Sequence, residues 1–399
     1  MDRLILEAAD CFDGQRFLGP STIQVENGVF HAILHGTALP SESLPPLFFD
    51  PVVPRERAAF VMPPMAEAHC HIFLEGDELD DAKRAEHLKA PRETLLATAR
   101  KNLGKYRDAG ITVLRDAGDI HGVNLAVRAV ARDMGMTIHA AGAGLRRVKR
   151  YGSFMANEVA DDLVGAVTRL AENADVIKII LTGIIDFANG VVKGAPQFTL
   201  EETQLIVDTA HALGKKTFAH CSGLDGLRVA VMAGVDSIEH GFFMNREILE
   251  GMARGNLAWV PTILPVHFQW EHPQYGGWDD ATRGRLRDIL DNHAECLREA
   301  ESLGIRILAG SDGGSFGVRH GAGLLEELRL LRETGLSAET VLTAATSAPR
   351  QHFGLAGGFI RPGEPAEYLM LPASPRADFS ILQNAARTLI TPCAACPPV

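Results

Sequence analysis

Five polar residues stand at the ends of apolar, strand-like runs in this 399-residue chain, and a sixth, Lys178, lies within such a run. The six are His69, His71, Lys178, His220, His240 and Asp312. His69 and His71 form an HCH motif, and residues i and i+2 of a strand point to the same side, so that two imidazoles can bind one ion. Such a pair alone is a weak signal. All six together are hard to explain as core packing, because burying so many polar groups without a shared partner is very costly.

Lys178 raises the sharpest chemical question, because β-branched residues flank it on both sides in the run VIKII. A lysine is almost never fully buried unless a partner pairs with it or its charge is removed. The side chain therefore either extends outward or has its amine in use. Burial lowers the pKa of an amine and leaves it neutral and nucleophilic. The alternative is an unmodified Lys178 paired with Asp312 or another carboxylate nearby.

Eight strand-like runs alternate with helical patterns from about Val61 onward and must position these side chains. Eight strand–helix units predict a (β/α)8 barrel, also called a TIM barrel, whose catalytic groups lie at the C-terminal strand ends. Two of the helical patterns carry an apolar face at Leu205, Ile206, Thr209, Ala210 and Leu213, and at Leu286, Ile289, Leu290, His293, Leu297 and Ala300. The runs span 65–71, 111–115, 137–141, 176–181, 216–220, 235–239, 257–261 and 305–310.

The two chain ends show a different pattern. Asn27 and Gly28 separate two apolar runs, which predicts a β-hairpin. The stretch GGFIRPGEPAEYLML, residues 357–371, predicts a second hairpin. We expect the two ends to form a small β-sandwich beside the barrel. The sandwich would comprise residues 1–60 and 354–399, and the barrel residues 61–353.

The composition indicates which classes of partner and which cellular compartment to expect. The net charge of −11 argues against a nucleic-acid-binding surface. No apolar stretch has the length of a membrane span, and acids among the first ten residues lead us to expect no secretory signal. Six scattered cysteines indicate free thiols in a reducing cytoplasm. Cys393 and Cys396 form a lone C-x-x-C motif, which does not favour a zinc knuckle.

Six segments together resemble the amidohydrolase superfamily of metal-dependent hydrolases, in the family's order along the whole barrel. The fourth strand and the SIEHG segment most resemble the binuclear branch related to Xaa-Pro, Xaa-Arg and Xaa-Lys dipeptidases and to imidazolonepropionase-like hydrolases. The segments are AEAHCH, GITVLRDAG, DVIKIILTG, KKTFAHCSG, AGVDSIEHG and LAGSDGG.

This resemblance implies a metal centre with two divalent ions. His69 and His71 resemble the ligands of the more buried ion, and His220 and His240 those of the second ion. Lys178 resembles the lysine that reacts with carbon dioxide to form a carbamate, whose two oxygens bridge the ions. Zinc fits these nitrogen and oxygen ligands, and such sites also accept manganese or cobalt.

The resemblance also implies a reaction. Asp312 resembles the aspartate that binds the more buried ion and shuttles a proton. A hydroxide activated by both ions would cleave an amide C–N bond, of a dipeptide or an N-acyl amino acid. A lactonase or phosphotriesterase would use the same centre and remains open. A non-catalytic scaffold typically lacks the ligands, and all six are present here.

Three residues depart from the family's pattern. Ser222 stands where the dipeptidase-like branch often has a histidine, so one contact to substrate is in doubt. Glu367 stands where the family usually has aspartate. Gly223 occupies the position at which mononuclear deaminases carry glutamate, which counts against deamination.

Substrate choice is expected from the loops at the barrel mouth. The basic loop residues could hold a substrate carboxylate through charge-assisted hydrogen bonds, although a solvated basic loop explains each of them equally well. The aromatic segment 265–278 could be a lid, a pocket wall or an oligomer contact. We expect a small-molecule substrate, no nucleic acid and no membrane, and leave a homo-oligomer open. The candidate substrate-binding residues are His121, Arg146, Arg147, Tyr151, Lys193 and His320.

Overall fold

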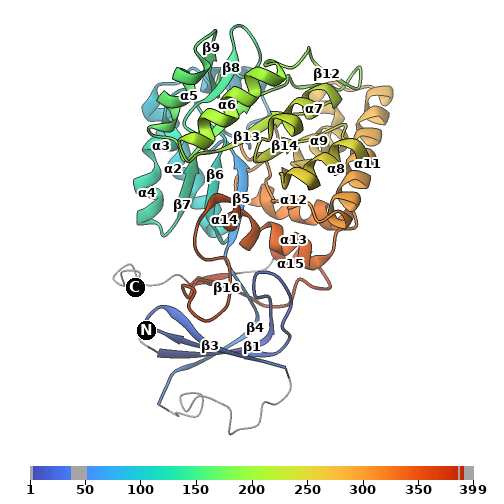
Figure 1. Ribbon diagram of the computed structural model, residues 1–399. Coiled ribbons are helices and arrows are strands. Elements are labelled where there is room, and N and C mark those ends of the chain that lie inside the picture. Colours follow the sequence, from blue (N-terminus) through green and yellow to red (C-terminus); the bar gives the residue numbers. More distant parts are fainter. Residues whose placement is uncertain (1–2, 37–51, 385–386, 391–399) are drawn as a thin grey trace.

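The computed structural model describes residues 3–36, 52–384 and 387–390 (Figure 1). The strands at the chain ends are β1 (Arg3–Cys11), β2 (Ser21–Glu26), β3 (Val29–His35), β4 (Arg55–Met62), β16 (Tyr368–Leu371) and β17 (Thr388–Ile390). The strands between them are β5 (Met65–Cys70), β6 (Ile111–Asp116), β7 (Thr137–Ala140), β8 (Gly144–Arg147), β9 (Ala156–Val159), β10 (Val176–Ile180), β11 (Ile185–Asp186), β12 (Val191–Val192), β13 (Lys216–Cys221), β14 (Ser237–His240) and β15 (Ala258–Val260).

Helices follow most of the parallel strands and cover them from outside, which makes a mixed α/β fold (Figure 1). The helices are α1 (Asp81–His87), α2 (Arg92–Asp108), α3 (Val123–Ala126), α4 (Arg128–Asp133), α5 (Leu163–Ala171), α6 (Leu200–Ala212), α7 (Leu224–Ala233), α8 (Arg246–Gly255), α9 (Ile263–Glu271), α10 (Pro273–Gly276), α11 (Asp280–Ser302), α12 (Ala322–Glu333), α13 (Ala338–Ala344), α14 (Ser347–Phe353) and α15 (Ser380–Asn384).

The parallel strands form two sheets, in the orders β5-β6-β7 and β15-β14-β13-β10-β8-β9. Every residue of β5, β6 and β10 is buried, as expected for strands covered on both faces. Segment 305–313 links the two sheets through isolated parallel bridges, from Ile307 to β15 and from Gly313 to β5. The described ladders do not join into one continuous eight-stranded sheet.

The predicted strand at 305–310 is the clearest departure among these elements. It forms only bridges, because its backbone groups bond to several neighbours in turn. Leu308 donates its N–H to Trp259, whereas Ala309 donates to Ala344, the last residue of α13, and accepts from Ala68 of β5. A segment whose amide leaves the sheet for a helix end cannot extend a ladder. It still lies between β15 and β5, where a final strand is expected.

The helical faces were predicted with mixed success. The buried face of α11 includes all six predicted positions from Leu286 to Ala300. The face predicted for α6 is confirmed at Ile206 and Ala210, whereas Leu205 and Leu213 are 44% and 42% exposed. Thr203 and Val207 complete the buried face of α6.

The chain ends build one six-stranded sheet, in the order β17-β16-β4-β1-β2-β3, below the parallel strands in Figure 1. The first predicted hairpin is confirmed: β2 and β3 pair antiparallel around Asn27 and Gly28, which have φ of 50° and 77°. The second is wrong, since residues 357–371 supply only β16, which pairs with β4 and β17. Pro362 and Pro365 have no N–H to donate to a ladder, and Glu364 accepts instead from Phe30 of β3.

Four buried cysteines, Cys11, Cys70, Cys221 and Cys296, have free thiols. Cys393 and Cys396 lie outside the described residues. Within the residues that the structure describes, no helix combines the length and apolar character needed to cross a membrane.

Candidate metal centre and adjoining cavity

The six sequence-predicted ligands come from five separate parts of the parallel layer. His69 lies in β5 with His71 one residue beyond it, Lys178 is the middle residue of β10, and His220 lies near the end of β13. His240 is the last residue of β14, and Asp312 lies in the linking segment 305–313. The C-terminal ends of neighbouring parallel strands meet at one edge, which is why residues so far apart in sequence can share a site.

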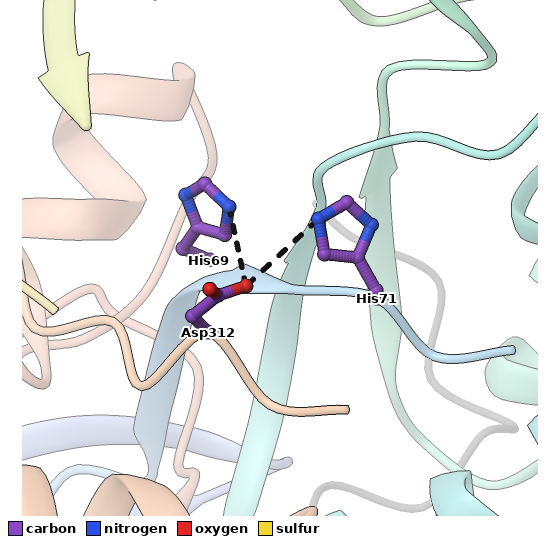
Figure 2. A group of neighbouring side chains, drawn as sticks. All are labelled: His69, His71 and Asp312. Carbon is purple, nitrogen blue, oxygen red and sulfur yellow. Dashed lines mark ion pairs between the residues drawn. The ribbon is translucent and has the colours of Figure 1, made fainter. Parts of the chain in front are cut away.

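His69, His71 and Asp312 form a group that could hold a metal ion (Figure 2). The Nε2 atoms of the two histidines lie 3.7 and 3.9 Å from Oδ1 of Asp312. One ligand atom from each residue lies within 4.8 Å of the other two. Two imidazole nitrogens and a carboxylate oxygen are a donor set that suits zinc and similar divalent ions.

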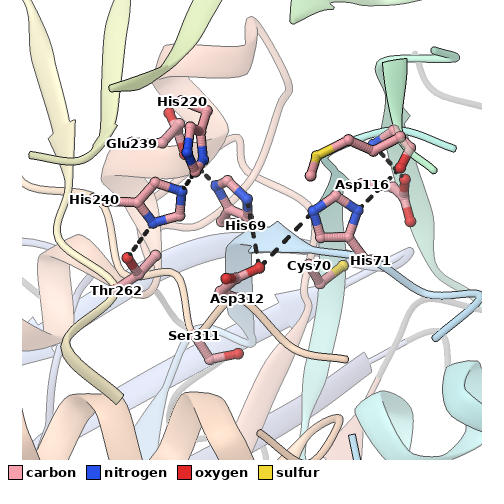
Figure 3. Close-up of polar contacts among 12 residues, drawn as sticks. His69, Cys70, His71, Asp116, His220, Glu239, His240, Thr262, Ser311 and Asp312 are labelled. Carbon is pink, nitrogen blue, oxygen red and sulfur yellow. Dashed lines mark hydrogen bonds and ion pairs between the residues drawn. The ribbon is translucent and has the colours of Figure 1, made fainter. Parts of the chain in front are cut away.

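Hydrogen bonds fix which ring nitrogens of His69 and His71 carry the proton (Figure 3). Nδ1 of His69 lies 2.6 Å from Oε2 of Glu239, and Nδ1 of His71 lies 3.0 Å from the carbonyl oxygen of Gly118. Both partners only accept, so each Nδ1 donates and each Nε2 keeps its lone pair. Burial lowers the pKa of both histidines well below the usual value. The rings are therefore neutral, as metal ligation requires.

His220 and His240 form a second pair beside the first, outside the group of three (Figure 3). Nδ1 of His220 lies 2.8 Å from Nε2 of His240. Nδ1 of His240 donates to Thr262, whose hydroxyl donates in turn to the carbonyl of Pro261. Burial lowers the pKa of His220 to about 3 and that of His240 well below normal. The two nitrogens that face each other could thus face a common ion.

Lys178 is buried, with 1% of its surface exposed, and its Nζ has weak partners. Nζ lies 3.4 Å from Nε2 of His71 and 3.3 Å from Sδ of Met155. Among the described residues no ion pair joins it to a carboxylate, so the pairing required by an unmodified lysine is not seen there. Burial lowers its pKa to about 8. About a quarter of such amines is neutral at pH 7.5, in the form that attacks carbon dioxide.

Backbone strain is concentrated at the same place. His240, Thr262 and Asp312 have φ of 65°, 47° and 58°, a region that non-glycine residues rarely adopt. Thr262 is β-branched, which makes this conformation especially unfavourable. Such strain persists only where the surrounding structure enforces it, and it occurs mainly at functional sites.

Two buried glutamates that were not predicted from the sequence form hydrogen bonds that hold His69 in place. Glu239 accepts from Nη2 of Arg115 at 2.7 Å and from Ser237 at 2.8 Å, in addition to His69. Glu67 accepts from the backbone N–H of His69 and from the N–H and hydroxyl of Ser311. Burial raises the pKa of Glu67 to about 7. The sequence signal that could have identified them is their position. Glu239 lies one residue before His240 and Glu67 lies two residues before His69, each in an apolar strand where a carboxylate without a partner would not be buried.

A cavity of about 240 Å³ adjoins the centre. Asp312 lines it, and burial raises the pKa of this carboxyl to about 6. Ser222, at the position that departs from the family's pattern, also lines it. The cavity is lined by Tyr151, Gly183, Ile184, Ile185, Phe187, His220, Ser222, His240, Phe242, Thr262, Pro265, Val266, Gln269, Asp312, Ser315 and Phe316.

Of the predicted substrate-binding residues, Tyr151 lines this cavity and its ring packs 5.3 Å from that of His220. His121 is separated from His71 by the ring of Phe73, which contacts both. Both ring nitrogens of His320 are engaged, with the hydroxyl of Tyr106 and the carbonyl of Leu74. The structure thus brings one of these three residues to the cavity.

The predicted basic residues lie outside the cavity lining. Arg146 pairs with Glu158 at 3.0 Å, and Arg147 pairs with Glu202. Lys193 is exposed. Their contact with a substrate carboxylate stays a prediction.

The aromatic segment 265–278 forms part of the cavity wall through Pro265, Val266 and Gln269 of α9. Glu367, the other departure from the family's pattern, lies 3.8 Å from Arg350 of α14 and does not line the cavity.

Comparison with known proteins identifies a matching family model and several related sequences. The model of the amidohydrolase family matches residues 60–391. An uncharacterized protein of Mycobacterium tuberculosis is 28% identical over 330 residues, 82% of each chain. Ochratoxinase of Aspergillus niger is 25% identical over 220 residues, which are 54% of this chain and 44% of that protein.

Two solved structures share the fold. A Xaa-Pro dipeptidase with bound methionine has a TM-score of 0.79 at 23% identity, over 98% of both chains. The A. niger ochratoxinase has a TM-score of 0.81 at 18% identity, over 98% of this chain and 95% of that one. At such identities the likeness establishes the fold alone.

Proposed function

The chain belongs to the amidohydrolase family, and from that premise we propose that it cleaves an amide C–N bond with two divalent metal ions. Membership makes it a metal-dependent hydrolase. The observation that carries the proposal is the convergence of His69, His71 and Asp312 on one point, with both ring lone pairs free for an ion. Zinc is the ion that suits these donors best.

The second ion of the proposal rests on His220 and His240. Their facing nitrogens and their neutral state support it, and the hydrogen bond to Thr262 holds the ring of His240 in place. Lys178 would join the two halves of the site as a carbamate. Its burial and its lack of an ionic partner among the described residues support that modification.

Metal ions at this site would polarise the substrate carbonyl and lower the pKa of water. The chain's own residues supply the proton transfer and the shape. Oδ1 of Asp312 lies beside the two Nε2 atoms and would accept a proton from the attacking water. Its pKa of about 6 suits it to receive the proton and then pass it to the leaving amine near neutral pH.

The finer architecture belongs to the same proposal. We take the two parallel sheets and segment 305–313 as the wall of one (β/α)8 barrel. The bridges from Ile307 and Gly313, and the hydrogen bond from the N–H of Asp175 to the carbonyl of Ala140, support closure. The proposed divisions are 1–60 and 354–399 for the sheet of the chain ends and 61–353 for the barrel.

A hydrolysis screen tests the function. Protein purified without chelators would be assayed for metal content and then incubated with dipeptides, N-acyl amino acids, neutral amides, lactones and phosphotriesters. We expect close to two divalent ions per chain and turnover of at least one amide. A protein that holds no metal and gains none from zinc or manganese would reject the proposal. Turnover of lactones or phosphotriesters alone would keep the centre but change the reaction.

A further inference from the structure

The cavity beside the metal centre has two unlike sides. His220, His240 and Asp312 make one side, and the remainder is largely apolar, with Ile184, Phe187 and other aliphatic and aromatic side chains. Among the described residues that line it, no lysine or arginine occurs and Asp312 is the one acid. A carboxylate entering this space would lose hydration without gaining a cationic side chain, and it would approach the charge of Asp312.

Three basic side chains around the cavity have partners elsewhere. Arg147 pairs with Glu202, and Nη2 of Arg150 donates to the carbonyl of Ala195. Arg84 lies behind the ring of Phe316, 5.5 Å from its centre, where it donates to the carbonyls of Glu75 and Gly314. Bringing any of these cations to the cavity would break contacts that the fold already makes.

Gln269 supplies one directed polar group. Its Oε1 accepts from the indole N–H of Trp278 at 2.7 Å, and because an indole only donates, the oxygen must be the atom that faces it. The amide nitrogen of Gln269 therefore points away from Trp278, and it has no hydrogen-bond partner among the described residues. Since Gln269 lines the cavity, its N–H groups are available to an acceptor on a ligand.

We propose that this cavity selects amides whose bound group is uncharged and apolar, with Gln269 donating a hydrogen bond to an acceptor oxygen. The proposal rests on the hydrolytic function above and names its substrate class. The volume of about 240 Å³ limits the size. A cavity of about 150 Å³ holds a benzene molecule, so one aromatic ring or branched alkyl group with its amide fits here. This assignment weighs against the basic loop residues as holders of a substrate carboxylate.

A matched ligand pair tests the charge preference. N-(2-phenylethyl)acetamide and N-acetylphenylalanine differ only by one carboxylate. Their ketone analogues, with CH2 in place of the amide N–H, cannot be hydrolysed and report binding alone. With metal-loaded protein and isothermal titration calorimetry, we expect the neutral ketone to bind on the order of tenfold tighter than its carboxylate twin.

Equal binding, tighter binding of the carboxylate, or binding of neither ketone would overturn the proposal. The two amides are assayed in parallel for cleavage. If the neutral ketone binds as expected but no amide in the screen is cleaved, the hydrolytic function fails while the assignment of the cavity stands. The two failures are thus distinguishable.

Two substitutions locate the effect. Ile184 lines the cavity and is 42% exposed, so Ile184→Arg adds a cation at the rim without disturbing the core. It should shift the ratio of the two affinities toward the carboxylate ketone by about tenfold. Leu205→Arg, at a 44% exposed position of α6, adds the same charge away from the cavity and should change neither.

Gln269→Glu keeps an acceptor for Trp278 and replaces the N–H donors by a carboxylate. It should weaken binding of the neutral ketone about tenfold, whereas Gln204→Glu on the exposed side of α6 should not. An unchanged affinity in Gln269→Glu would contradict the role given to Gln269.

Discussion

At the scale of single residues, the centre depends on where a few protons lie. Glu239 and Gly118 hold the Nδ1 protons of His69 and His71, and this leaves both Nε2 lone pairs directed at Oδ1 of Asp312. Arg115 in turn holds Glu239. Burial lowers the pKa of Lys178 and thus favours its neutral amine.

Lys178→Ala tests the proposed bridge. Removing the amine removes the carbamate oxygens, so we expect metal content to fall from about two ions per chain to about one and most activity to disappear. Elemental analysis and turnover measure both effects, and a short carboxylic acid in excess should partly restore activity by supplying the missing oxygens. Lys101→Ala, on the exposed face of α2, is the control. A crystal structure of the unsubstituted protein from bicarbonate buffer, with a bare amine beside two ions, would falsify the carbamate.

Asp312→Asn tests the proton transfer. An amide cannot accept the proton, so turnover should fall by roughly 10²–10⁴-fold, the usual contribution of a general base. Metal content is measured in the same samples, because Asp312 is also a proposed ligand. Asp208→Asn on the surface of α6 should leave both quantities unchanged. Near-normal turnover in a metal-replete Asp312→Asn protein would remove Asp312 from the mechanism.

At the scale of elements, α9 connects the metal centre to the cavity wall. It begins directly after Thr262, which holds His240, and it carries Val266 and Gln269. The buried carboxyl of Glu327 on α12 accepts from the N–H groups of Ile263 and Leu264, the first two residues of α9. These N–H groups have no partner within the helix, so Glu327 fixes where α9 starts.

Glu327→Gln gives this contact a pH signature. Burial raises the pKa of Glu327 to about 8, above the ordinary value of 4.5, so the folded protein holds a proton that the unfolded chain releases. The stabilisation that protonated Glu327 contributes to the folded state is fully present below pH 4.5 and is lost as the pH rises through 8. Between pH 5.5 and 8, the free energy of unfolding should therefore fall by on the order of 2–3 kcal/mol more in the unsubstituted protein than in Glu327→Gln.

Urea unfolding at both pH values measures this difference. Glu295→Gln, at an exposed position of α11, should follow the unsubstituted protein. A difference between protein and Glu327→Gln that does not depend on pH would show that Glu327 titrates normally.

Local patterns predicted the elements whose form is set by neighbouring residues. Asn27-Gly28 has the backbone freedom that a two-residue hairpin turn requires, and the spacing in α11 matches its single buried face. The sequence did not reveal the bridges at 305–313 or the complete buried face of α6. Those depend on which distant backbone groups and helices lie opposite. Glu239 and Glu67 escaped selection for the same reason, since their partners are up to 244 residues away.

At the scale of the whole molecule, one face of the sheet of the chain ends packs into the hydrophobic core of the parallel layers, while the rest of that sheet has a buried cluster of its own. The largest buried cluster contains Phe60 and Met62 of β4 and Leu369 and Leu371 of β16 together with residues of the parallel strands and the helices that cover them. The side chain of Leu369 packs directly against Gly110, in the turn between α2 and β6. The proposed boundaries therefore separate the two parts in the sequence, although side chains from both parts pack in the same buried cluster.

Leu369→Ala tests whether the two parts unfold together. Leu369 is fully buried, and such a truncation costs about 2–5 kcal/mol. All three tryptophans, Trp259, Trp270 and Trp278, lie among the parallel strands and their helices, so their fluorescence reports on that part alone. With a shared core, the loss at β16 must lower the urea midpoint seen by tryptophan fluorescence as much as the midpoint seen by circular dichroism. Leu205→Ala, at an exposed position, should move neither. A tryptophan transition that stays in place while circular dichroism shows an earlier one would mean that the sheet unfolds independently and that the parallel layers stay folded without it.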